Sequence, residues 1–372
     1  MSADQGLDIF NTRFHNPSIF AIRERTRYQG ALTDFCVPAN SYFPPEAMLA
    51  SIRAELPDIL KYYPDYAEVH QDNIARVIDV PAEHIVAANG VTELITLLCQ
   101  DAEGPIATCV PTFGRWTDLP VEYQVPVQFI MRDKARDFRL EVREIVAQVR
   151  SMGARTLVIS NPNNPTGAWL EPHEVTELVM ALQDLSLILI DESFMDFAGL
   201  GSAEKLAMSL PNVMVVKSMG KSLGWHGVRL GYGVANANLA RQWRARLPYW
   251  NINGLAAFVL KHLPNYKAEY AESFRKVAAD REYMYQRLQE VPGLRTYPSR
   301  ANFLLSELPE GVSGKALRNV LLQEHGLVVR ECSNKVGSSE QFLRNVVRRP
   351  PDTDKLIAAL QTCLPDFLRE AA

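Results

Sequence analysis

Residues 156–167 have the sequence TLVISNPNNPTG. The continuous apolar run at its start is typical of a strand that helices cover on both faces. Two X-Pro bonds, three asparagines and a glycine follow directly, and this composition predicts a tight, irregular turn. A plain turn does not require three amides, and ligands of open α/β sheets bind beyond the carboxyl ends of the strands. The segment is therefore a candidate binding loop, with a plain turn as the alternative.

The chain around this segment alternates short apolar runs with helical stretches. Seven strands are expected, over residues 84–88, 106–110, 127–131, 156–160, 185–190, 213–217 and 230–234. Helices are expected between them, for example at residues 92–100, 140–151 and 171–184. This alternation predicts an α/β fold of three layers, in which helices cover both faces of a mainly parallel, seven-stranded sheet.

The pattern changes after about Lys261. Helices are expected at residues 266–290, 314–325 and 353–364, and strands at residues 302–305 and 327–331. This order predicts a smaller α+β domain, and a chain of 372 residues is too long for one ordinary core. We therefore expect a large domain over residues 46–262, and a small domain that combines residues 1–45 with residues 263–372.

Composition limits the classes of partner. The formal net charge is −4, which does not suggest a nucleic-acid or membrane-surface partner. No apolar run approaches the roughly 20 residues of a membrane helix, and the first residues lack the apolar core of a secretory signal. The five cysteines are scattered without a CxxC pair, so we expect no metal site and a reducing, cytoplasmic location.

Two further strand ends carry unusual polar residues. Asp191 and Glu192 follow the run at 187–190, where carboxylates are costly unless they are paired. A helix N-cap is one interpretation of Asp191, and a carboxylate facing a cation in a cleft is the other. Lys217, Ser218 and Lys221 follow the run at 213–216, with Arg229 beyond. Together with the Gly-rich turn, these residues indicate an anion site for a phosphate.

A fourth strand end adds a second phosphate-binding element. Residues 89–92 read Asn-Gly-Val-Thr, where a strand is expected to end and a helix to begin. Free N–H groups at a helix start bind phosphate, although any strand-to-helix turn resembles this one. The four segments together suit one cofactor, which has a phosphate, a ring nitrogen to face Asp191, and a carbonyl that a lysine can attack.

The motifs AANGVTE, VPTF, SNPNNPTG, IDESFMDF and SMGKSLGWHGVRLGYG occur here in the order of a known family. From about Phe10 to its C-terminus the chain resembles the class I/II aminotransferases, which have the pyridoxal-phosphate (PLP) fold type I. Within that family the chain is most similar to the threonine-phosphate decarboxylases and histidinol-phosphate aminotransferases, and YPSRANFLL and VVRECSN resemble the decarboxylases especially. The resemblance implies PLP as cofactor and a homodimer with shared active sites.

The resemblance also implies a role for individual residues. Lys221 would hold PLP as a Schiff base, with Lys217 as its competitor in the sequence. Asp191 would pair with the ring nitrogen, Asn164 would bond the phenolic oxygen, and Phe113 would stack on the ring. The phosphate would be held by Gly90, Val91, Thr92, Ser218 and Arg229, and by Tyr63 of a neighbouring subunit. Arg344 would bind the substrate carboxylate, with Arg348 and Arg349 as alternatives, and Asn40 would contact the substrate.

Some positions depart from the family pattern. Position 194 is Phe where aminotransferases usually have Tyr, Gly220 replaces a Ser or Thr, and Pro38 stands where Asn is usual. Residues 10–18 also lack the HGG segment of the threonine-phosphate decarboxylases. We therefore expect a biosynthetic enzyme that cleaves a bond at Cα or Cβ of a specialised amino acid, by transamination or decarboxylation. β-Elimination is the alternative, and a non-enzymatic regulator is a remote one.

Overall fold

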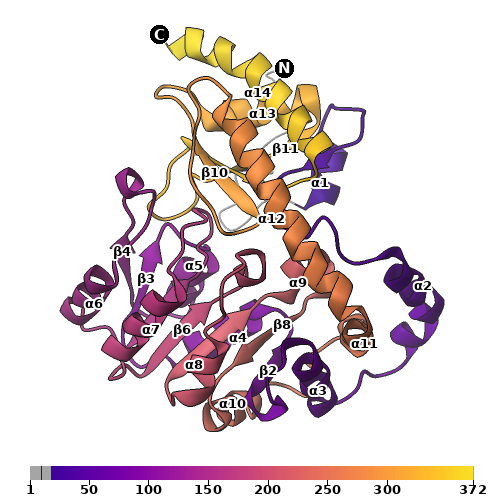
Figure 1. Ribbon diagram of the computed structural model, residues 1–372, viewed down its shortest axis with the longest axis vertical. Helices are drawn as coiled ribbons and strands as arrows, with labels where there is room; N and C mark the ends of the chain where they lie inside the picture. Colours follow the sequence, from indigo (N-terminus) through magenta and orange to yellow (C-terminus); the bar gives the residue numbers. More distant parts are fainter. Residues whose placement is uncertain (1–9, 11–17, 372) are drawn as a thin grey trace.

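A computed structural model of the chain describes Phe10 and residues 18–371. Its lower body contains a seven-stranded sheet in the order β2-β8-β7-β6-β5-β3-β4 (Figure 1). The strands are β2 (Ile85–Ala88), β3 (Ile106–Val110), β4 (Val127–Met131), β5 (Thr156–Ser160), β6 (Leu187–Asp191), β7 (Val213–Lys217) and β8 (Gly231–Val234). Strand β8 is antiparallel to both of its neighbours, and the other pairs are parallel. The expected mainly parallel sheet is confirmed.

Helices cover both faces of this sheet. One face packs on α6 (Val142–Ser151), α7 (Pro172–Ala181) and α8 (Glu204–Ser209), and the other on α4 (Val91–Asp101), α5 (Arg115–Glu122) and α10 (Ala237–Arg244). Every residue of β3, β5, β6 and β7 is buried, which explains their continuous apolar runs. Along β6, Ile188 and Ile190 face α6 and α7, whereas Leu189 faces α4 and α5.

The upper body is built on an antiparallel sheet in the order β12-β13-β10-β9. These strands are β9 (Arg295–Thr296), β10 (Phe303–Glu307), β12 (Arg330–Glu331) and β13 (Phe342–Val346), and α13 (Gly314–His325) and α14 (Pro350–Ala371) pack beside them. Near the N-terminus, α1 (Ile19–Arg25) and β1 (Thr33–Asp34) join this body, because β1 pairs with β11 (Leu327–Val328). The single strand expected over 327–331 is therefore two short strands. Strand β13 was not expected.

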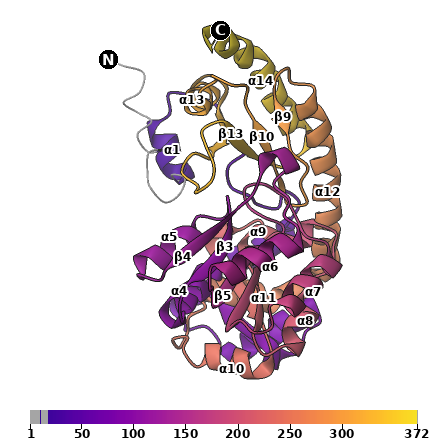
Figure 2. The ribbon, with the colours of Figure 1, turned by 90° about the vertical axis from the view of Figure 1, so that its left-hand side faces the viewer.

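Long helix α12 (Lys267–Gln289) connects the two bodies (Figures 1 and 2). At its lower end, α2 (Glu46–Lys61), α3 (Ala67–Ile78), α9 (Met219–Ser222) and α11 (Gly254–His262) form a core with β2 and β8. The division between residues 45 and 46 and between residues 262 and 263 stays a prediction. Residues 1–9 and 11–17 of the expected small domain lie outside the described residues.

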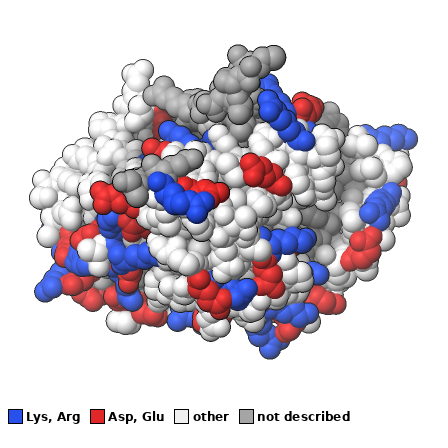
Figure 3. Space-filling model, turned by 90° about the horizontal axis from the view of Figure 1, so that it is seen from above, with Lys and Arg blue, Asp and Glu red and all other residues white. Residues whose placement is uncertain are grey.

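The surface is of mixed charge on the face seen in Figure 3, where Lys and Arg are interspersed with Asp and Glu. Among the described residues, none of the helices has the length and apolarity needed to cross a membrane. All five cysteines are buried. The cytoplasmic location inferred from their spacing stays a prediction.

Candidate active site

Asp191 is the last residue of β6 and lies in register with Ser160 of β5 and Val216 of β7. Because side chains alternate along a strand, Asp191 shares the face of Leu189, towards α4 and α5. It is 6% exposed, and its carboxylate accepts hydrogen bonds from Trp116 Nε1 at 2.8 Å and from the backbone N–H of Ser193 at 3.0 Å. Both donors are neutral, so the site still suits a cationic partner for this carboxylate.

Sequence reasoning missed Trp116. This residue lies in α5, only 1% exposed, and reaches Asp191 across 75 positions of the chain. A buried tryptophan needs an acceptor for its N–H group, which was the only signal available. The hydrogen bond fixes one carboxylate oxygen of Asp191 from the helix that follows β3.

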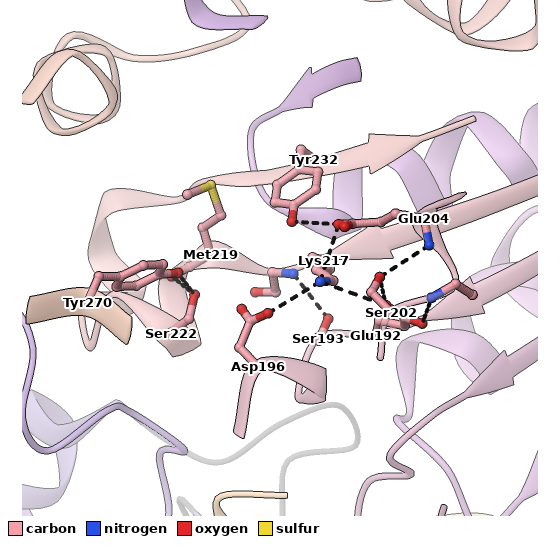
Figure 4. A network of polar contacts seen from close by, with 12 residues as sticks. Glu192, Ser193, Asp196, Ser202, Glu204, Lys217, Met219, Ser222, Tyr232 and Tyr270 are labelled. Carbon is pink, nitrogen blue, oxygen red and sulfur yellow. Dashed lines mark hydrogen bonds and ion pairs between the residues drawn. The ribbon is translucent and has the colours of Figure 1, made fainter. Parts of the chain in front are cut away.

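Lys217 belongs to the opposite face of the sheet, where carboxylates surround it (Figure 4). Its amine is 3.2 Å from Glu204, 3.3 Å from Asp196 and 3.8 Å from Glu192. Burial opposes the charged form, but Asp196, Tyr232 and the two glutamates raise the pKa of Lys217 well above its ordinary value. A lysine held charged in this way is a poor nucleophile. The geometry therefore disfavours Lys217 as the cofactor lysine.

Lys221 has a different environment, although it lies only four positions further on, in α9. Burial, opposed by Asp191 and helped by Arg229 and Arg344, lowers the pKa of Lys221 to about 8. The amine lies 5.2 Å from the ring centroid of Phe194 and 5.9 Å from that of Phe113. A lysine whose neutral form is accessible near neutral pH can attack a carbonyl or move a proton.

The expected phosphate-binding residues gather at the start of α4. Gly90 is the N-cap of this helix, with φ of +75°, and a Cβ atom there would lie 2.7 Å from Nη2 of Arg229. A Cβ atom on Gly231 would lie 2.9 Å from the backbone N of Val91, so β8 also approaches this turn closely. The guanidinium of Arg229 and the N-terminal N–H groups of α4 thus converge, as an anion site requires.

Ser218 is the N-cap of α9, and its backbone N–H donates to Oγ of Ser193 at 3.2 Å. Ser218 and Thr92 are both half-buried at these helix starts. The glycine at position 220 has a steric reason, because a Cβ atom there would lie 3.2 Å from Cα of His226. A serine or threonine at this position would crowd the backbone that leads to Arg229.

Arg344 connects the upper body with the SNPNNPTG loop. It lies in β13, 5% exposed, and its Nη1 donates to Oδ1 of Asn164 at 2.8 Å. Nη2 donates to the backbone O of Cys36. Arg348 and Arg349 instead donate to the backbone O atoms of Asp34 and Ser41. Among the hydrogen bonds of the described residues, Arg344 alone of these three arginines reaches the loop, which favours it over Arg348 and Arg349 as the residue facing the site.

Asn40 lies in the site but has no spare hydrogen-bonding capacity on its amide nitrogen. Its Nδ2 donates to the backbone O of Ser222 at 2.9 Å and to Oγ of Ser273 at 2.7 Å. Its backbone N–H donates to the carbonyl of Lys221 at 3.0 Å. These contacts hold the segment that carries Lys221, and they do not support the expected contact of Asn40 with the substrate.

Tyr63 lies on the surface and, among the described residues, its ring contact is with Trp250. It is 81% exposed, follows α2, and stacks on Trp250 with ring centroids 4.7 Å apart. This placement leaves its hydroxyl at the surface. Within one chain it does not join the site.

The side chains described above fit PLP. Asp191 offers a buried carboxylate for the ring nitrogen, and Lys221 offers an amine close to its neutral state for the aldehyde. The start of α4 and Arg229 offer a phosphate site, and Phe113 offers a ring face beside Lys221. The assignment of each residue to the cofactor stays a prediction.

Comparisons with known proteins agree with this chemistry. The chain is 32% identical to the CMP-5'-(3-aminopropyl)phosphonate synthase of Streptomyces rubellomurinus over 88% of its own length and 52% of that protein. It therefore spans about half the length of that relative. It is 28% identical to the L-serine phosphate decarboxylase of Sulfurospirillum multivorans, over 96% of this chain and 94% of that one.

A solved structure, of a decarboxylase from Sulfurospirillum multivorans, superimposes with a TM-score of 0.87 at 27% identity. The superposition covers 95% of this chain and 94% of the other. The model of the family "Aminotransferase class I and II", which is PLP-dependent, matches residues 32–360. The chain therefore belongs to the class I and II aminotransferase family.

Proposed function

We propose that this protein is a PLP-dependent enzyme that decarboxylates an amino acid carrying a phosphate or phosphonate group. The observation that carries the proposal is the contrast between the two lysines: Lys217 is held charged by carboxylates, whereas the pKa of Lys221 is lowered beside Asp191. The names of the relatives support the substrate class, because both include a phosphorylated or phosphonate amino compound. Transamination is the second candidate, since the family includes both chemistries.

When bound, PLP withdraws electrons from the Cα atom of the attached amino acid. Asp191 would keep the ring nitrogen of bound PLP protonated through its buried carboxylate, which Trp116 and Ser193 orient. Arg344 presents a planar guanidinium to the substrate carboxylate and is itself positioned by Asn164. Lys221 supplies an amine that holds or releases a proton near neutral pH.

Phe194 favours decarboxylation over general transamination. It is 4% exposed, its ring lies 5.2 Å from Nζ of Lys221, and it packs edge-to-face on Phe303. It offers no hydroxyl where aminotransferases usually have a tyrosine, so the phenolic oxygen of bound PLP would accept one hydrogen bond fewer. The relatives described above give no support to β-elimination or to a non-enzymatic regulator.

Product analysis tests the reaction. Incubation of the PLP-loaded protein with O-phospho-L-serine is expected to give the corresponding amine and carbon dioxide, detected by mass spectrometry. Lys221→Ala is the control and is expected to be inactive. A keto acid with matching formation of pyridoxamine phosphate, from this substrate or from glutamate, would establish transamination instead. If neither product forms with any member of a panel of phosphorylated and phosphonate amino acids, the proposed function is wrong.

We also propose that the protein is a homodimer with shared sites. Tyr63, Tyr66, Tyr249 and Trp250 form an exposed aromatic patch in which Tyr63 and Tyr66 stack on Trp250. Patches of this kind mark protein interfaces. The neighbouring Asn251 donates to Glu93 in the first turn of α4 at 2.8 Å, so the patch adjoins the phosphate site. A twofold axis beside it would bring each Tyr63 towards the partner's phosphate.

Subunit mixing tests this arrangement. Tyr63→Ala and Lys221→Ala homodimers are each expected to have low activity. In a random mixture, about a quarter of all sites have both residues intact, so about a quarter of the wild-type activity should return. Lys221→Ala mixed with Asp191→Asn is the control, because each of its sites keeps a defect. A stable and active monomer would refute the proposal.

Chemical labelling tests the choice of lysine. The PLP-loaded protein is expected to be yellow, and reduction with borohydride should fix a pyridoxyl mass on the peptide with Lys221. The reason is that the amine of Lys221 reaches its neutral form near pH 8, whereas Lys217 stays charged. Peptide mass spectrometry resolves the two positions. A label on Lys217 would contradict the assignment.

The role of Trp116 is tested by Trp116→Phe. The variant loses the hydrogen bond to Asp191, and bonds to charged groups contribute about 1.5–3 kcal/mol. The dissociation constant of PLP is expected to rise roughly tenfold or more. Trp243→Phe is the matched control, since Trp243 belongs to the same core cluster. Its substitution should change stability without weakening the binding of PLP. Equal PLP affinity in both variants would exclude the role.

A further inference from the structure

Three buried cations lie together in the upper body, beside the candidate site. Arg330 is 9% exposed, Lys335 7% and Arg344 5%. Each makes hydrogen bonds to uncharged groups: Arg330 to Asn334 at 2.7 Å, Arg344 to Asn164 and Cys36, and Lys335 to the backbone O of Thr112 at 3.3 Å. Within the described part of the chain, no carboxylate lies within ion-pair distance of any of the three. Buried charges without counter-ions are costly, which indicates that an anion belongs among them.

Lys335 is the member of this group that sequence reasoning did not single out. Its amine lies 6.0 Å from the ring centroid of Phe113, whose ring is also 5.9 Å from the amine of Lys221. Its loop follows β12 and packs on the carboxyl end of β3, where a Cβ atom on Gly337 would lie 3.4 Å from the backbone N of Pro111. Lys335 therefore reaches from the upper body to the ring that we expect to cover the cofactor.

A purely structural role explains Lys335 poorly. Among the described residues its amine makes one hydrogen bond, to the backbone O of Thr112, which is long at 3.3 Å and uses one of three N–H donors. A single weak hydrogen bond does not offset the burial of an ammonium group. Burial, helped by Arg330 and Arg344 and opposed by Cys332 and Asp118, lowers the pKa of Lys335 to about 7.

We propose that Lys335 contacts the substrate directly and, together with Arg330, binds its second anionic group, a phosphate or phosphonate. Arg344 remains for the α-carboxylate, so the three cations divide between the two anionic groups of one substrate. The proposal rests on the proposed function and assigns a residue that selects its substrate class. Where the amine of Lys335 is neutral, it takes up a proton from solvent when the dianion binds, because the anion stabilises its charged form.

This assignment has a defined pH dependence. Below pH 7 the lysine is already charged, so the dianion binds with full affinity. Above pH 7 a proton must be taken up, and affinity falls by up to tenfold for each pH unit until the pH passes the pKa of the bound state. An arginine at position 335 stays charged throughout and removes this fall.

The experiment measures binding to the PLP-loaded enzyme by stopped-flow absorbance of the cofactor at pH 6 and pH 8. The probes are O-phospho-L-serine and L-serine, which lacks the second anion. The variants are Lys335→Gln and Lys335→Arg, with Lys315→Gln as the control because Lys315 is exposed on α13. Protonation of the ligand and of the cofactor also changes with pH, but it changes equally in wild type and in Lys335→Arg. The ratio of their affinities therefore reports on position 335 alone.

Lys335→Gln is expected to weaken the binding of O-phospho-L-serine about ten- to hundredfold at pH 6. The binding of L-serine should weaken less than about threefold. Between pH 6 and pH 8, the affinity of the wild type for O-phospho-L-serine should fall about tenfold relative to that of Lys335→Arg. If Lys335→Gln loses the same affinity for both probes, or loses none, the role of Lys335 is wrong. A wild type that does not prefer the phosphorylated probe would also overturn this role. A wild type whose cofactor responds to neither amino acid would overturn the proposed function itself.

Discussion

The ion cluster around Lys217 is the interaction on which the site depends. It joins the ends of three adjacent strands, because Glu192 follows β6, Lys217 ends β7, and Tyr232 of β8 donates to Glu204 at 3.0 Å. The carboxylate of Glu192 also accepts from the backbone N–H of Ala203 at 2.8 Å. Since side chains alternate along strands, these charges collect on one face of the sheet and leave Asp191 on the other.

This separation explains how two lysines four residues apart acquire opposite properties. Carboxylates stabilise the charge on Lys217, whereas Lys221 lies beside Phe113 and Phe194 and close to the cations Arg229 and Arg344. The same surroundings that lower the pKa of Lys221 also suit an anionic ligand. The site therefore combines a reactive amine with a positive environment, and that combination matches an amino acid with two acidic groups.

The sequence predicted the strands of the large sheet within two residues, because buried parallel strands have continuous apolar runs and end in unusual polar residues. It did not predict β13, since the strand FLRNV carries Arg344 and Asn345, whose charge and polarity resemble a surface segment. The contacts that complete the site are long-range: Arg344 reaches Asn164 across 180 positions. The sequence suggested Asn40 as a substrate contact, but its amide nitrogen donates to Ser222 and Ser273 within the protein, which only coordinates could reveal.

The central claim is that Lys221 has a lowered pKa while Lys217 remains charged. An NMR titration of the cofactor-free protein with [ε-13C]lysine measures this directly, and Lys221→Ala and Lys335→Gln identify the resonances. The account predicts one lysine that titrates near pH 8 and vanishes in Lys221→Ala, and a second near pH 7 that vanishes in Lys335→Gln. Titration of Lys221 near 10.5, the ordinary lysine value, would contradict it.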